Sequence, residues 1–249
     1  MMRMPFEWLQ AEWPAPAHVR TASTLRTGGV SAVPFDSLNL GDHVGDAPEA
    51  VRANRQRLAQ ALQLPNAPCW LNQVHGARVI EAGSWATPPQ ADACIARSAG
   101  QVCVVMTADC LPVLICSRDG DRVAAAHAGW RGLAGGIFES TVSSLGLPGS
   151  QLMAWLGPAI GPQVFEVGDE VRIAFMAKEA AAAQAFKPSY RAGHWLADLY
   201  LLARQELARL GVQAVYGGGL CTYSDEARFF SYRRESRTGR MASLIWLTE

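Results

Sequence analysis

The spacing of hydrophobic and polar residues predicts a chain in which helices and strands alternate. Apolar residues recur at helical spacing in four segments, residues 48–62, 133–145, 166–183 and 196–210. Short apolar or β-rich runs predict strands at residues 102–106, 113–116, 123–126, 152–156, 213–216 and 241–247. Several of the connections are short enough to be hairpins. The pattern therefore predicts an α+β (mixed α/β) fold.

Local signals mark the ends of several elements. Asp46 and Glu49 form a variant capping box before the first helix, and Pro48 suits the first turn of that helix. The alanine-rich run at residues 177–185 is typical of the end of a helix. The three glycines at 217–219 lack the spacing of a phosphate-binding loop and predict a tight turn.

The composition favours one globular domain that binds a small molecule. The chain has 249 residues, of which 49% are hydrophobic, and no linker or repeat divides it, so we expect a single domain over residues 1–249. The 22 basic and 22 acidic residues cancel, so the overall charge favours neither nucleic acid nor an anionic membrane as a partner. A small-molecule substrate is the better expectation.

The N-terminal segment predicts a protein that stays in the cytoplasm. Residues 1–20 contain acidic residues and prolines, but no apolar run long enough for a signal peptide or a membrane span. The six cysteines are spread through the chain and form no C-x-x-C pair. We therefore interpret them as free thiols in a reducing compartment.

Three potential metal ligands lie at or near the ends of predicted elements. His75 lies in a polar segment, Cys110 follows the strand 102–106, and His127 follows the strand 123–126. A strand end holds a residue firmly while the next loop leaves room for substrate. Two imidazoles and a thiolate suit Zn²⁺ and leave a fourth position open. Spacing alone is not diagnostic, because isolated histidines and cysteines are often core residues.

The same side chains allow a metal-free alternative. In that interpretation Cys110 is the nucleophile, His127 is the base, and Asp109 or another acceptor orients the base. Both interpretations need Cys110 as a thiolate. Two further roles are open to Asp109. It could act as a general acid or base beside a metal, or it could accept backbone N–H bonds in its turn.

Polar loops supply candidates for binding phosphate or substrate. Arg26, Arg131 and Arg233 lie in segments rich in glycine or polar residues, where a guanidinium can bind phosphate through two hydrogen bonds. His43 lies in a comparable loop and could line a pocket. The alternatives are solvated arginines and a histidine held by the neighbouring residues of its turn.

Four segments occur in a set order along the chain, namely residues 72–76 (NQVHG), 107–112 (TADCLP), 127–132 (HAGWRG) and 229–234 (FFSYRR). In this order they resemble the YfiH-like family, whose members are variously labelled polyphenol oxidase or laccase, purine nucleoside phosphorylase and peptidoglycan editing factor. The likeness extends over nearly the whole chain. Four ordered motifs are far more specific than any one of them.

The resemblance implies a single-domain layered sandwich of β-sheets covered by helices. It implies one zinc ion held by His75, Cys110 and His127. It also implies phosphorolysis of adenosine, inosine, guanosine and methylthioadenosine, together with deamination of adenosine. The two activities are chemically compatible, because arginines can hold phosphate for attack at ribose C1′ and a metal-activated water can attack C6 of adenine.

The other family labels and a non-catalytic role are alternatives. A multicopper laccase needs a histidine-rich trinuclear cluster in addition to a His₂Cys copper site, and a chain with five histidines can hardly supply both. Copper at the His-Cys-His site could still give some oxidase activity. The editing-factor label implies an amidase that removes a wrong amino acid from a UDP-muramoyl precursor. A fourth protein ligand, such as Cys103 or Cys116, would favour a non-catalytic zinc or ligand-binding module.

Overall fold

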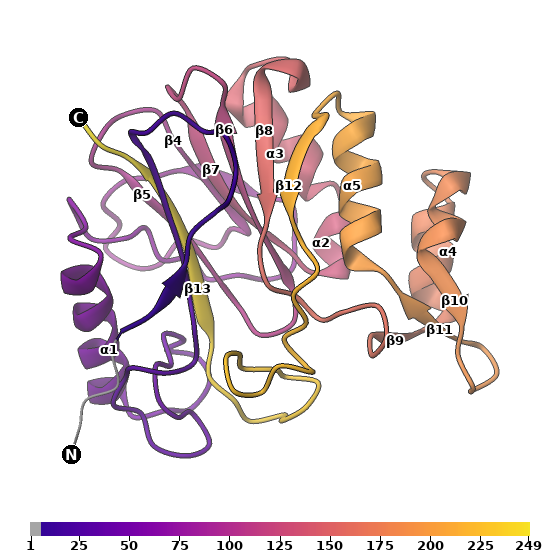
Figure 1. Cartoon of the computed structure of the whole chain (residues 1–249), viewed down its shortest axis with the longest axis horizontal. Coiled ribbons are helices and arrows are strands. Elements are labelled where there is room, and N and C mark those ends of the chain that lie inside the picture. Colours follow the sequence, from indigo (N-terminus) through magenta and orange to yellow (C-terminus); the bar gives the residue numbers. More distant parts are fainter. Residues whose placement is uncertain (1–5) are drawn as a thin grey trace.

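Two β-sheets lie at the centre of the fold, which a computed structural model describes for residues 6–249 (Figure 1). The larger sheet has the strand order β12-β8-β6-β7-β4-β3. Its strands are β3 (Val79–Glu81), β4 (Ala93–Ala96), β6 (Leu111–Ser117), β7 (Val123–Ala128), β8 (Leu152–Leu156) and β12 (Ala214–Gly217). Neighbouring strands are antiparallel, except for the parallel pairs β12–β8 and β3–β4 at the two edges.

The smaller sheet contains strands from both the N-terminal and the C-terminal parts of the chain. Its antiparallel strand order is β1-β2-β13-β5. The strands are β1 (Trp8–Leu9), β2 (Val19–Thr24), β5 (Val102–Thr107) and β13 (Met241–Leu247). The C-terminal strand β13 therefore lies between the N-terminal strand β2 and β5, which forms one edge of this sheet.

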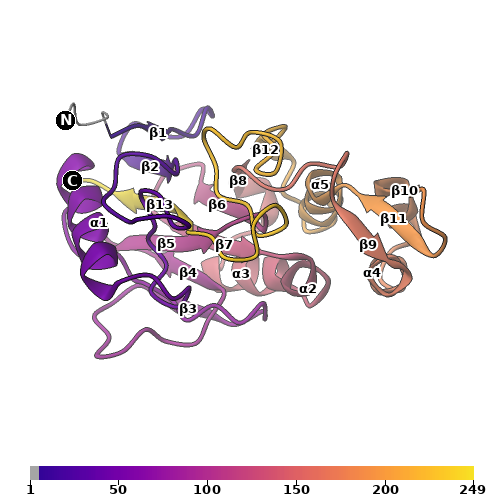
Figure 2. The same ribbon diagram turned by 90° about the horizontal axis from the view of Figure 1, so that it is seen from below.

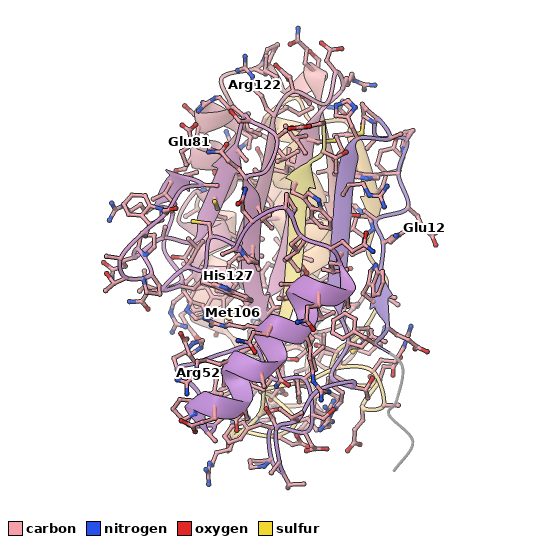
Figure 3. All side chains as sticks on the ribbon, turned by 90° about the vertical axis from the view of Figure 1, so that its left-hand side faces the viewer. Glu12, Arg52, Glu81, Met106, Arg122 and His127 are labelled. Atoms are coloured by element: carbon pink, nitrogen blue, oxygen red, sulfur yellow. The ribbon has the colours of Figure 1, made fainter. Side chains whose placement is uncertain are left out.

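Strand β5 shows how the layers are assembled from the sequence. Cys103 and Val105 belong to the core cluster between the two sheets. Val102 and Val104 point the other way and pack in a cluster with residues of α1 (Pro48–Ala61), which covers the outer face of the smaller sheet (Figure 3). Alternate residues of a strand face opposite sides, so a continuously apolar run satisfies both layers. The strand predicted at 102–106 is confirmed, and both of its faces are covered.

Helices cover the outer face of the larger sheet. They are α2 (Trp130–Ala134), α3 (Ile137–Leu145) and α5 (Leu199–Arg209), with a short 3₁₀ turn at Gly149–Gln151. Their apolar side chains, such as Phe138 and Leu207, share one buried cluster with Ile115 of the sheet. The order helix, sheet, sheet, helix confirms the layered sandwich that the family resemblance implies.

A small three-stranded sheet projects beyond α5 and corrects the prediction of a helix over 166–183 (Figures 1 and 2). Its elements are β9 (Glu166–Gly168), α4 (Asp169–Met176), a 3₁₀ helix (Ala180–Ala185), β10 (Phe186–Pro188) and β11 (His194–Ala197). Val167 pairs with Trp195, so backbone hydrogen bonds to β11 hold the start of the expected helix extended. The alanine-rich run forms 3₁₀ turns rather than the end of an α-helix.

Two other predicted helices have different boundaries in the structure. The expected helix over 133–145 is divided by Gly135 and Gly136, and Gly136 has a φ of 95°, which breaks a right-handed helix. The expected helix over 196–210 begins only at Leu199. Asp198 caps it by accepting a hydrogen bond from the Leu201 N–H at 3.0 Å.

The predicted capping box of the first helix is wrong. The N-cap is Ala47, which makes no side-chain cap bond, although Pro48 does occupy the first turn as expected. The Asp46 carboxylate instead accepts bonds from Ser31 Oγ at 2.6 Å and Asn39 Nδ2 at 2.9 Å, because a nearby loop competes for it.

The sequence predicted a tight turn at the glycines 217–219 and no membrane-spanning segment near the N-terminus. All three glycines have positive φ values of 71°, 87° and 83°, but Gly217 ends β12 and Gly218 and Gly219 form no turn or bend, so the prediction of a tight turn at 217–219 is wrong. Within residues 6–249, no helix combines the length and the apolar character needed to cross a bilayer.

Candidate metal centre

His75, Cys110 and His127 meet at one end of the sheet sandwich. Their ligand atoms all lie within 4.8 Å of one another, and Cys110 Sγ lies 3.7 Å from His75 Nε2. The two imidazole rings stand nearly edge to face, with centroids 4.8 Å apart at an angle of 73°. Figure 3 shows His127 and Met106 toward one end of the strands and Arg122 at the other.

Each of the three residues reaches this point from a different part of the fold. His127 lies within β7, one residue before its end. Cys110 lies immediately before β6, where the chain passes from the smaller sheet into the larger one. His75 lies in the loop before β3, with a φ of 62°, which residues other than glycine rarely adopt. The centre therefore depends on strand pairing between segments far apart in sequence.

The donor atoms and the space around them fit a metal ion. Zinc–nitrogen and zinc–sulfur bonds of about 2.1 and 2.3 Å put tetrahedral N and S ligands about 3.6 Å apart, close to the 3.7 Å between His75 Nε2 and Cys110 Sγ. A Cβ atom at Gly129 would lie 2.9 Å from Cys110 Sγ and 2.9 Å from His75 Cδ2. Only a glycine lets the chain pass this close to the three ligands, which could together hold a metal ion.

The group is open rather than closed by a fourth protein ligand. Cys103 and Cys116, the proposed fourth ligands of a structural site, are buried in the core between the sheets. Within the part of the chain that the structure describes, no further histidine, cysteine or carboxylate joins the three. Structural zinc sites usually close all four positions, so the geometry favours a reactive site over a non-catalytic module.

Asp92, which the sequence analysis missed, connects both histidines. This fully buried carboxylate accepts hydrogen bonds from His127 Nδ1 at 2.9 Å and from the His75 N–H at 2.9 Å. Its other oxygen accepts from the N–H groups of Gly76 at 2.7 Å and Val74 at 3.2 Å. The only sequence signal is an acidic residue directly before an apolar run, and the pairing of β4 with β7 cannot be read from it.

The electrostatics favour a thiolate beside a protonated imidazole when no metal is bound. Burial acts to raise the pKa of Cys110, but His127 and His75 outweigh it and lower this pKa to about 6. Burial acts to lower the pKa of His127, but Cys110 and Asp92 outweigh it and raise this pKa to about 9. Burial also opposes ionisation of Asp92, yet the hydrogen bonds from His127 and Gly76 hold its pKa below the usual value. A thiolate is the form that binds metal or attacks a substrate.

The three residues open into a cavity of about 490 Å³. Its other lining residues are His43, Gln73, Met106, Thr107, Ala108, Asp109, Ile160, Phe165, Tyr232, Arg233 and Arg240. The wall is thus apolar on several sides and carries a few charged groups, as is usual for a small-molecule site.

Asp109 lies at the wall of this cavity in a constrained turn. Its φ is 97°, and its side chain is largely buried. One carboxylate oxygen accepts from Thr222 Oγ1 at 2.6 Å, and the other accepts from the Arg233 N–H at 2.7 Å. The carboxylate does accept a backbone N–H bond, although from a distant segment rather than from its own turn. Its role as a general acid or base stays a prediction.

Arg26 and Arg131 lie outside the cavity, contrary to expectation. The Arg26 guanidinium is nearly buried, where it pairs with Asp36 at 3.5 Å, donates to the Glu226 carbonyl at 3.2 Å and stacks over Phe230. Its binding capacity is used within the fold, so phosphate binding by Arg26 does not follow from the structure. Arg131 stacks over Trp130 and lines an adjoining groove.

Arg233 and His43 do line the cavity, and two further residues join them. Arg233 donates to the Glu166 carbonyl at 2.9 Å. Arg240 and Tyr232 were missed by the sequence analysis, and the Arg240 guanidinium lies over the Tyr232 ring. Their sequence signal is slight: Arg240 directly precedes β13, and Tyr232 lies in the motif FFSYRR.

Comparisons with known proteins identify relatives of this chain over almost its whole length. A family model described as "Multi-copper polyphenol oxidoreductase laccase" matches residues 20–248. A purine nucleoside phosphorylase of Pseudomonas aeruginosa is 59% identical over 242 residues, which cover 97% of this chain and 99% of that protein. Purine nucleoside phosphorylase YfiH of Escherichia coli is 54% identical over 237 residues, covering 95% of this chain and 97% of its relative.

A solved structure supports the same assignment. The crystal structure of a Neisseria meningitidis protein of the DUF152 family superposes with a TM-score of 0.93 at 52% identity, covering 97% of this chain and 99% of that one. The match therefore extends over nearly the whole fold. The chain belongs to the YfiH-like family, whose sequence model bears the polyphenol oxidoreductase description.

Proposed function

We propose that this chain is a zinc-dependent purine nucleoside phosphorylase that also deaminates adenosine. The observation that carries the proposal is the open group of His75, Cys110 and His127 at the wall of a cavity of about 490 Å³ that also contains two arginines. Such a volume suits a nucleoside-sized ligand. The names of the relatives from Pseudomonas aeruginosa and Escherichia coli support the substrate class.

The charged and apolar walls of the cavity suit phosphorolysis. A phosphate oxygen forms a bond to C1′ of the ribose while the bond from C1′ to the purine nitrogen breaks, and the leaving base takes up a proton. Arg233, Arg240 and His43 would bind and orient the phosphate. Ile160 and Phe165 would pack against the nucleoside and exclude water.

Deamination needs a proton carrier rather than a phosphate. Water adds at C6 of adenine, and ammonia leaves. A zinc ion supplies Lewis-acid chemistry and lowers the pKa of water. Asp109 is the proposed carrier of the proton, because its carboxylate lies on the cavity wall and the bonds from Thr222 and Arg233 hold it in place.

A phosphate-dependence assay tests this proposal. Purified protein with zinc should release adenine and ribose 1-phosphate from adenosine only when phosphate is present, and should form inosine without phosphate. Cys110→Ala, or removal of zinc with a chelator, should slow both reactions by at least about 100-fold, which corresponds to about 2.7 kcal/mol. Cys116→Ala, a change at a buried thiol within β6, the strand that follows Cys110, is the control and should retain activity.

Two outcomes would contradict the proposal. A metal-free protein with full activity would exclude the zinc-dependent mechanism and favour Cys110 as a nucleophile. Release of an amino acid from a UDP-muramoyl-amino acid, without phosphate and with no reaction on adenosine, would replace the phosphorylase with the amidase.

A further inference from the structure

A single carboxylate contacts both histidine segments of the metal centre. Asp92 Oδ1 accepts from His127 Nδ1 and from the His75 N–H, each at 2.9 Å. Asp92 Oδ2 accepts from Gly76 N–H at 2.7 Å and Val74 N–H at 3.2 Å. All four donors therefore point at one buried side chain, which does not itself belong to the ligand group.

The bond to His127 selects the nitrogen that faces the ligand group. An ionised carboxylate can only accept hydrogen bonds, so Nδ1 of His127 must carry its proton toward Asp92. Nε2 is then the ring nitrogen left for a metal. The backbone adds a second connection, since the Asp92 carbonyl accepts from the His127 N–H at 2.7 Å. The imidazole ring is thus held in one orientation, with Nδ1 toward Asp92 and Nε2 toward the ligand group.

The bonds to the 74–76 loop hold His75 in an uncommon conformation. With a φ of 62°, the His75 backbone is in the left-handed region, which a side chain with a Cβ disfavours. The three consecutive N–H groups on Asp92 offset that preference. His75 is itself exposed, so packing alone does not keep its ring in place.

We propose that Asp92 is the positioning residue that assembles the metal centre before the metal binds, by fixing the His127 ring and the left-handed turn at His75 with one carboxylate. This inference rests on the proposed metal site. It predicts that the 74–76 loop is ordered in metal-free protein and that the carboxylate, rather than an amide of equal size, is required.

The variant Asp92→Asn tests the need for a carboxylate. An asparagine offers one acceptor oxygen, and its NH₂ group would face N–H donors, so about half of the four bonds would be lost. We expect zinc affinity, measured by competition with a chromophoric chelator, to fall by about 10- to 100-fold.

Asp46→Asn is the matched control. Asp46 also holds a loop through two side-chain hydrogen bonds, from Ser31 and Asn39, but it contacts no member of the ligand group. Its zinc affinity should stay within about twofold of that of the unchanged protein. Equal zinc affinity for Asp92→Asn and the unchanged protein would overturn the inference.

Hydrogen exchange on the unchanged protein provides a measurement that does not depend on the variant folding. The amides of His75 and Gly76 should be protected after zinc is removed. If they exchange freely without zinc and become protected only when zinc is added, the metal assembles the loop and Asp92 does not. Failure of the unchanged protein to bind zinc at all would instead refute the proposed metal site itself.

Discussion

At the scale of single residues, Arg26 and Arg233 look alike in the sequence but have different surroundings in the fold. Both lie in polar or glycine-bearing loops and both were predicted to bind phosphate. The Arg26 guanidinium is held by Asp36 and by backbone carbonyls, whereas Arg233 lines the cavity beside Asp109. Loop composition cannot separate these cases, because the partners come from distant segments.

This difference predicts opposite effects of removing each charge. Arg233→Met should raise the KM for phosphate roughly 10-fold or more, since a charge-assisted hydrogen bond contributes about 1.5–3 kcal/mol. Arg26→Met should lower the free energy of unfolding by about 1–3 kcal/mol and leave that KM unchanged. Steady-state kinetics with varied phosphate, together with urea denaturation, measure both quantities. A similar rise in KM for the two variants would show that Arg26 also contacts phosphate.

The lowered pKa of Cys110 predicts how its reactivity depends on pH. In zinc-free protein the thiolate should be present above a pKa of about 6, whereas an ordinary thiol needs a pH of about 8.5. The rate of alkylation by iodoacetamide should therefore rise through about pH 6 and then level off. The rate of the Cys110→Ala variant, which reports the remaining thiols including the half-buried Cys221, is subtracted. A midpoint near pH 8.5 would show that the histidines do not stabilise the thiolate.

At the level of secondary-structure elements, the N-terminal caps of two helices differ from those that the sequence suggested. The motif at Asp46 and Glu49 looks like a capping box but makes no cap. The Asp46 carboxylate accepts hydrogen bonds from Ser31 and Asn39 instead. Asp198, which the helical pattern included within a longer segment, is the actual cap of α5. A capping motif shows which bonds are available, and the packing of neighbouring loops decides which are made.

The two helix starts should respond differently to truncation. Asp198→Ala removes the acceptor for the Leu201 N–H and should lower the free energy of unfolding by about 1 kcal/mol. Glu49→Ala removes only an exposed ion pair with Arg52 and should cost less than about 0.5 kcal/mol. Urea denaturation of both variants measures the difference. Equal losses of stability would indicate that Glu49 contributes to a cap in solution.

At the scale of the whole molecule, the site lies where the chain passes from one sheet to the other. Asp109 and Cys110 occupy this passage between β5 and β6. The pairing of β6 with β7 places His127 at the same end of the sheets. Arg240 also lies there, because it directly precedes the C-terminal strand β13. The cavity thus combines side chains from residue 43 to residue 240, none of which could form it locally.

The main strands, the first helix and the α+β class could be predicted from the sequence pattern, and the family motifs identified the three potential metal ligands. Apolar runs and helical spacing report burial directly, and the ordered motifs are distinctive enough to identify the family. Three features could not be predicted without the folded structure: Asp92 binds both histidine segments, Arg240 and Tyr232 line the cavity, and Arg26 does not. A buried polar side chain takes its role from its hydrogen-bond partners. Those partners come from segments that meet only when the two sheets pack together.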